Sequence, residues 1–166
     1  FLSFYQQQDV SVAAWDALAA VAPTVGVAGT DAHENALPSL MSDGERVDSY
    51  RRMMRWFSNV ALVDGDRPAQ VQDALASGRS FVAFEALGTP TGWDVHYGTL
   101  EMGGSGTVGD ALAVSCPGVA ATSPWSGEAP EITVTVYKNG AEWAAGCGRF
   151  PVTEPGVYRA VASIVP

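Results

Sequence analysis

A strand–turn–strand signal in the last third of the chain restricts the fold more than any other feature. Residues 131–138 alternate apolar and polar side chains, and Asn139-Gly140 follows them directly. Such alternation is typical of a strand with one buried face, and an Asn-Gly pair favours the tight turn of an antiparallel hairpin. Further strand patterns are ALAVSC before the hairpin and GVYRAVASIV after it. We therefore expect residues 98–166 to form an all-β antiparallel sandwich. The side chains expected inside it are Val134, Val136, Tyr158 and Val161.

Helical and strand patterns alternate in the first part of the chain, which predicts an α/β arrangement for residues 1–97. The predicted elements are, in order, a helix at 12–22, a buried strand at 25–29, helices at 45–60 and 66–77, and strands at 80–86 and 93–97. Pro68 in the first turn and Gly78 just past the end delimit the third helix. The chain begins at Phe1 and not at a methionine, so we expect it to be processed, proteolysed or trimmed.

Charge and composition exclude some classes of partner. The 166 residues carry a net charge of −9, which disfavours binding to the phosphate backbone of a nucleic acid. No apolar run is long enough to predict a membrane span. Cys116 and Cys147 form either a disulfide or two buried thiols. A disulfide predicts an oxidising, periplasmic or secreted location, whereas thiols leave the location open.

Asp31 and His33 follow the strand predicted at residues 25–29. Side chains two positions apart in an extended segment point to the same side, so the carboxylate and the imidazole can reach one point. Parallel α/β sheets bind ligands at the carboxyl ends of their strands. An aspartate and a histidine aimed at one point are suitable metal ligands, and we interpret this pair as a candidate metal site.

Three stretches together resemble a known family. GTDAHEN, then SYRRMMRWFSNV, then VQDALASGRSFVAFEALGTPTGWDV are similar to the carboxyl-terminal part of the polymerase and histidinol phosphatase (PHP) family of metal-dependent phosphoesterases. The resemblance covers roughly residues 15–97. The closing sandwich is similar to the small β-domain appended to some extracytoplasmic members.

The resemblance implies a fold and a site. Residues 1–97 would be the carboxyl-terminal segment of a distorted seven-stranded β/α barrel, and residues 98–166 an accessory β-sandwich. The family's site holds two or three divalent ions (zinc, manganese or iron), and its last motif corresponds here to Asp31 and His33. The family's earlier histidine motifs are absent, since the chain's other histidine is His96.

The resemblance therefore implies an incomplete metal site in this chain. We expect the fragment to be inactive alone, and we assign no catalytic residue. The expected partners are the missing amino-terminal half of a longer parent protein, or a second copy of the chain. In the parent, the expected substrate is a phosphorylated small molecule, hydrolysed by a metal-activated water.

Two other functions stay open at the level of sequence. The sandwich is either a non-catalytic module that binds a glycan, a peptide or a protein surface, or a purely structural cap on the barrel. Three arginines suit a substrate phosphate but more often form the solvated face of a helix: Arg51, Arg52 and Arg55. Three tryptophans suit a sugar platform but more often pack in a core: Trp93, Trp125 and Trp143.

Overall fold

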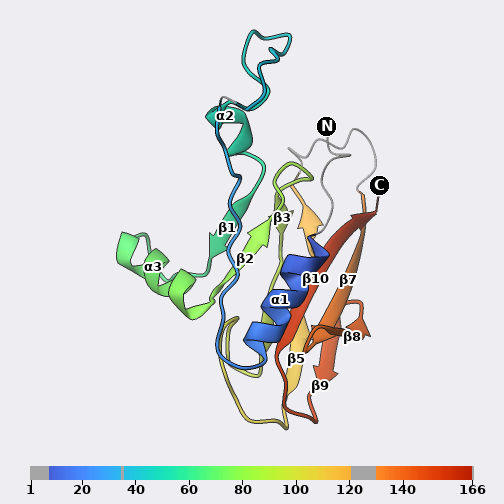
Figure 1. Ribbon diagram of the computed structural model, residues 1–166. Coiled ribbons are helices and arrows are strands. Elements are labelled where there is room, and N and C mark those ends of the chain that lie inside the picture. The colour runs from blue at the N-terminus through green and yellow to red at the C-terminus, as the bar shows by residue number, and fades with distance from the viewer. Residues whose placement is uncertain (1–7, 35, 121–129, 166) are drawn as a thin grey trace.

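The computed structural model describes residues 8–34, 36–120 and 130–165. Most regular structure in these ranges is β-strand, arranged in small antiparallel sheets with few helices (Figure 1). No β/α barrel is formed by the described residues. Within the same ranges, no helix has the length and apolar character needed to cross a membrane.

Three helices and ten strands are described. The helices are α1 (Asp9–Ala19), α2 (Tyr50–Met53) and α3 (Pro68–Ser77). The strands are β1 (Ser58–Ala61), β2 (Ser80–Ala83), β3 (Pro90–Thr91), β4 (Val95–Tyr97), β5 (Ala111–Val114), β6 (Gly118–Val119), β7 (Glu131–Lys138), β8 (Ala141–Ala145), β9 (Gly148–Pro151) and β10 (Tyr158–Val165).

Two three-stranded antiparallel sheets contribute to one hydrophobic core. Their strand orders are β10-β7-β8 and β4-β5-β9. Leu112 and Val114 of β5 cluster with Val134 and Val136 of β7, and Val152 after β9 completes the buried group. Val136 is fully buried. These sheets are consistent with the sandwich expected in the second part of the chain.

The hairpin predicted around Asn139-Gly140 is confirmed. Both turn residues have positive φ, +50° and +84°, which a type I′ turn requires and which Asn and Gly tolerate best. The turn joins β7 to β8. Positions 134 and 136 face the core as expected, and Tyr158 packs against it. The prediction for Val161 is wrong, because Val161 pairs with Thr135 and shares the opposite face of the sheet.

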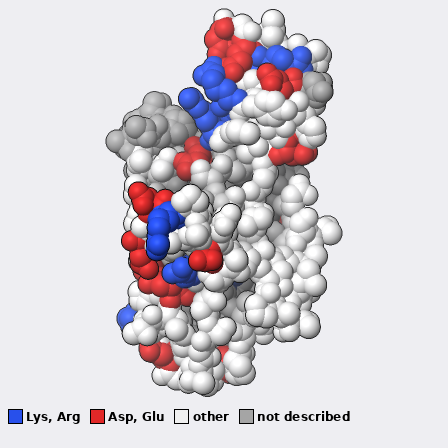
Figure 2. Space-filling view, turned by 90° about the vertical axis from the view of Figure 1, so that its left-hand side faces the viewer, with Lys and Arg blue, Asp and Glu red and all other residues white. Residues whose placement is uncertain are grey.

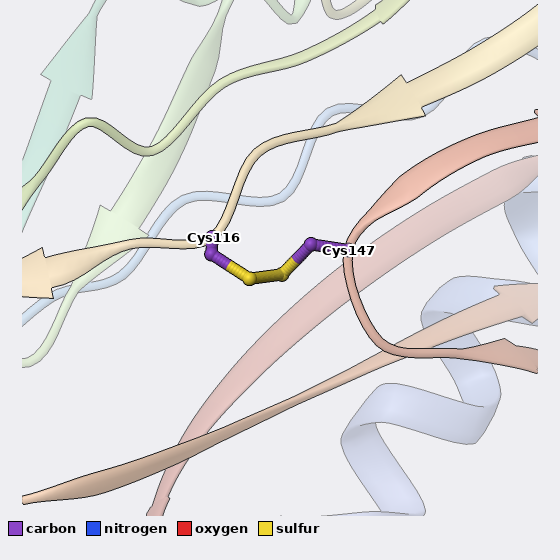
Figure 3. The surroundings of a disulfide bond; sticks show 2 residues. All are labelled: Cys116 and Cys147. Carbon is purple, nitrogen blue, oxygen red and sulfur yellow. A yellow bond between two sulfur atoms is a disulfide. The ribbon is translucent and has the colours of Figure 1, made fainter.

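A disulfide joins two connections of the second part, and two strand pairs link the second part to the first. Cys116, between β5 and β6, is bonded to Cys147, between β8 and β9 (Figure 3). The alternative of two free thiols is therefore excluded. Strand β4 pairs with β5, and β3 pairs with β6, so hydrogen bonding continues across residue 98. The division of the chain at this residue stays a prediction.

The helix predicted at 66–77 is confirmed as α3, which connects the antiparallel strands β1 and β2 (Figure 1). Pro68 starts it, since the first turn of a helix needs no donor there. Gly78 ends it in the left-handed conformation, with φ +74°. Among the described residues of the first part, the buried apolar ones are Ala74 of this helix and Ala83 of β2.

Two predictions for the first part are wrong. The segment 45–60 is not one helix: α2 is a single turn, and β1 follows it because residues 58–61 pair with β2. Residues 25–29 form no regular strand, since no neighbouring strand pairs with them. The first segment does have helical periodicity, and the second does have an apolar run. Whether each becomes a strand depends on the presence of a neighbouring strand to pair with, which local sequence does not specify.

Candidate functional site

The segment at residues 25–29 is extended and is held beside β1 by one side chain. The side-chain amide of Asn59 accepts from the Ala28 N–H at 2.9 Å and donates to the Ala28 carbonyl at 2.8 Å. These two bonds take the place of the pair of backbone hydrogen bonds that a neighbouring β-strand would make with Ala28. A Cβ at Gly26 would lie 3.1 Å from the Trp15 ring, so a larger side chain here would require the indole to shift. The segment therefore has a defined path without belonging to a sheet.

Asp31 and His33 lie close together at the end of this segment. The His33 Nδ1 atom lies 2.5 Å from the carbonyl oxygen of Asp31. The His33 Nε2 atom lies 3.7 Å from Oδ1 of Asp31. Their proximity was expected from the alternation of side chains along a strand. Instead, Asp31 has φ +50°, and a turn at this residue brings the two side chains together. Both side chains are exposed.

This geometry suits a metal ligand pair. A proton on Nδ1 donates to the backbone carbonyl, which leaves the lone pair of Nε2 available to an ion. Two ligands about 2.1 Å from a tetrahedral zinc ion are about 3.4 Å apart, close to the separation of Nε2 and the carboxylate oxygen. Among the described residues, no group of three or more His, Cys, Asp or Glu side chains converges. The described chain therefore offers two ligands at this point.

The second histidine lies in a similar pair that sequence reasoning did not single out. His96 in β4 places Nδ1 2.8 Å from Oδ2 of Asp94, and both side chains are partly exposed. The signal was present in the sequence, because Asp94 and His96 have the same Asp-x-His spacing as Asp31 and His33. Here Nδ1 is engaged by a carboxylate and not by a backbone carbonyl. This second pair provides an internal control for metal binding.

The arginines around α2 are engaged in ion pairs. Arg51 and Arg52 both contact Asp43 and Glu45 in the loop that projects above β1 (Figure 1). The hydrogen bond from Arg51 lowers the pKa of the Glu45 carboxyl. Figure 2 shows the two signs of charge intermingled at this tip. Arg51 fits the solvated, ion-paired interpretation, whereas Arg52 is ion-paired but half-buried. Arg55 is exposed beside them.

Two of the three candidate tryptophans pack against the core. The Trp143 ring lies edge-on to Tyr158, with centroids 4.9 Å apart, and to Phe150 at 6.0 Å. Trp93 also packs on the buried cluster. These contacts favour burial over a sugar platform. Trp125 lies outside the described residues.

Comparison with known proteins adds no neighbour: no family model, no curated protein and no solved structure matches this chain.

Proposed function

We propose that this chain is the carboxyl-terminal portion of a PHP-type metal-dependent phosphoesterase, in which Asp31 and His33 bind a divalent ion. The observation that carries the proposal is the local geometry of this pair. The backbone carbonyl of Asp31 orients the His33 imidazole through Nδ1. The Nε2 atom of His33 then lies beside the Asp31 carboxylate. The GTDAH stretch that contains the pair supports the assignment to this family.

The distribution of exposed apolar side chains supports a larger parent. Of the large apolar side chains described as exposed, all but Val108 and Val157 precede residue 98. The buried cluster, by contrast, lies in the second part of the chain. In our proposal residues 1–97 are the last segment of a β/α barrel, and residues 98–166 are its accessory sandwich. The missing amino-terminal half would cover the apolar side chains and supply the remaining ligands.

In the parent, a bound zinc, manganese or iron ion supplies an activated water and polarises a phosphoryl oxygen. The role of this chain is narrower. His33 would present Nε2 in a fixed tautomer, and Asp31 would contribute negative charge that balances the cation. The substrate in this proposal is a phosphorylated small molecule, and two ligands alone make the isolated chain inactive.

The disulfide supports an extracytoplasmic location for the protein. Bonded cysteines persist in the periplasm and in secreted proteins, and cytosolic reductants remove them. The Cys116–Cys147 bond joins the ends of strands from both three-stranded sheets. We therefore propose a periplasmic or secreted parent.

Metal affinity tests the proposal. We expect zinc titrated into the chain to bind weakly in calorimetry, and the variants His33→Ala and Asp31→Asn to weaken binding about tenfold or more. The matched control is His96→Ala, which removes the other Asp-x-His pair. Equal affinity in the wild type and His33→Ala would contradict the proposal and favour a non-catalytic binding module. Loss of binding only in His96→Ala would move the site to β4.

A further inference from the structure

A cavity of about 460 Å³ lies between α1 and the β7–β8 hairpin (Figure 1). One wall is a single face of α1, formed by residues three and four positions apart: Asp9, Val12, Ala13, Asp16 and Ala17. The opposite wall is the hairpin turn, with Asn139 and Gly140, and the first residue of β8, Ala141. The volume lies within the range of small-molecule sites in proteins.

Small residues on both walls leave this space open. Ala13 and Ala17 on the helix are exposed, since a methyl group is too short to reach the hairpin. The two walls approach each other at Gly140, where a Cβ would lie 3.2 Å from Oδ2 of Asp16. Asp16 also binds Arg159 of β10 through two hydrogen bonds, which hold α1 at this separation. The cavity therefore has a fixed shape.

The lining carries an excess of one negative charge. It contains two carboxylates, those of Asp9 and Asp16, and one guanidinium, that of Arg159. Arg159 balances Asp16 in a direct ion pair, so the charge in excess is that of Asp9 in the first turn of α1. The whole chain has a net charge of −9, which favours the approach of a cation and disfavours that of an anion. Both the local and the overall charge therefore select a cationic ligand.

The remaining lining is largely hydrocarbon. Val12 is half-buried in the helix wall, and the methyl groups of Ala13 and Ala141 lie on the two sides of the cavity. A bare divalent ion needs about six oxygen ligands, and such walls do not provide them. An ammonium group on a short alkyl chain fits better, because the charge can lie beside a carboxylate while the chain contacts the apolar walls.

We propose that this cavity binds a small organic cation, a primary ammonium on an aliphatic body. The ammonium lies beside the Asp9 carboxylate, and the body lies along Val12 and Ala13. A carboxylate has about four acceptor positions, so Asp9 can bind an ammonium in addition to the contacts it already makes. The inference is independent of the phosphoesterase proposal. The lining contains neither candidate metal ligand and none of the exposed large apolar side chains assigned to the missing half.

Three probes with the same alkyl chain test the selection by charge: pentylammonium, pentanol and pentanoate. Each is titrated into the nitrogen-15-labelled full chain, and the amide signals of Ala13, Ala17, Gly140 and Ala141 are followed. Pentylammonium should give saturable shifts with a Kd of about 1 mM. Pentanol should bind about fivefold more weakly, and pentanoate more weakly still. Asp9→Asn should weaken pentylammonium binding about fivefold and leave pentanol binding unchanged.

Filling the cavity tests its location. Ala13→Phe places a ring between the walls and should abolish binding of pentylammonium. Ala14→Phe is the matched control, because Ala14 is the neighbouring exposed residue of α1 and lies outside the lining. Circular dichroism of each variant verifies that the fold is intact. The proposal would be overturned if pentylammonium gave no saturable shift, or if pentanol or pentanoate bound as tightly. Binding that survives Ala13→Phe would overturn it as well, because the site would then lie elsewhere.

Discussion

Arg159 in β10 binds Asp16 in α1 through two hydrogen bonds, although 143 residues separate them. The Nε–Oδ1 distance is 3.0 Å and the Nη2–Oδ2 distance is 2.7 Å. Both side chains are largely buried, with 15% and 14% of their surfaces exposed. The guanidinium also stacks over the Tyr137 ring, 4.3 Å from its centroid. This pair fastens the first helix of the chain to the outer face of the last strand (Figure 1).

Removing one partner of this pair should destabilise the protein. Asp16→Ala leaves the guanidinium of Arg159 without its anion in a largely buried place, and we expect a loss of about 3 kcal/mol in the free energy of unfolding. Urea unfolding followed by circular dichroism measures the change. Asp73→Ala, on the exposed surface of α3, is the control and should change stability by less than about 0.5 kcal/mol. Equal stability of the two variants would show that α1 is not fastened by this ion pair.

The disulfide should contribute substantially to stability. Cys116 and Cys147 are 31 residues apart, and closing a loop of that length is worth about 4 kcal/mol through the entropy of the unfolded chain. Reduction should therefore lower the urea midpoint of the wild type. The double variant Cys116→Ser with Cys147→Ser should start at the lowered midpoint and not respond to reductant. An unchanged midpoint after complete reduction would contradict this prediction.

Asp48 should titrate below its ordinary pKa of 3.8. Burial alone raises the pKa of this carboxyl, but hydrogen bonds from the Leu37 N–H and from Arg46 lower it further than burial raises it. The charged form is thus favoured by folding. The stabilisation it gives to the projecting loop is complete above the ordinary value and is lost as the pH falls through the lowered pKa.

The amide proton of Leu37 reports this titration, because it donates to Oδ2 of Asp48 at 2.7 Å. Its chemical shift should move with a midpoint below 3.8. Asp48→Asn should abolish the movement. A midpoint at or above 3.8 in the wild type would mean that burial outweighs the hydrogen bonds.

The isolated chain should not hydrolyse phosphate esters at a useful rate. Two ligands do not hold the ions that activate water and stabilise the transition state, so an aryl phosphate with added manganese or zinc should turn over no faster than in a protein-free control. His33→Ala should behave like the wild type in this assay. Turnover that disappears in His33→Ala would contradict the prediction and show that this chain assembles a complete site by itself.

Local chemistry made part of the fold predictable from sequence. Pro68 marks the start of α3, because its missing N–H and fixed φ suit the first turn of a helix. Gly78 marks the end, because glycine tolerates the left-handed conformation there. Asn139-Gly140 specifies its turn in the same way. The pairing of Cys116 with Cys147 stayed open, because the distance between two cysteines depends on the tertiary arrangement of β5, β8 and β9.

The errors occur where a segment depends on a neighbour. Residues 25–29 have the composition of a buried strand, yet a strand needs a ladder partner, and a single Asn59 side chain replaces it. Residues 45–60 have a helical pattern, but residues 58–61 pair with β2 and form strand β1. The candidate ligands were brought together as expected, but by the positive φ of Asp31, which sequence periodicity does not encode.

The most direct test of the metal-ligand assignment follows the imidazole signals of the two histidines during a zinc titration. Nitrogen-15 spectra distinguish Nδ1 from Nε2, and the chain has only His33 and His96 to assign. We predict that zinc shifts the Nε2 signal of His33, that Nδ1 stays protonated, and that Asp31→Asn reduces the effect. The His96 signals should stay in place. Shifts confined to His96, or none at either ring, would contradict the account.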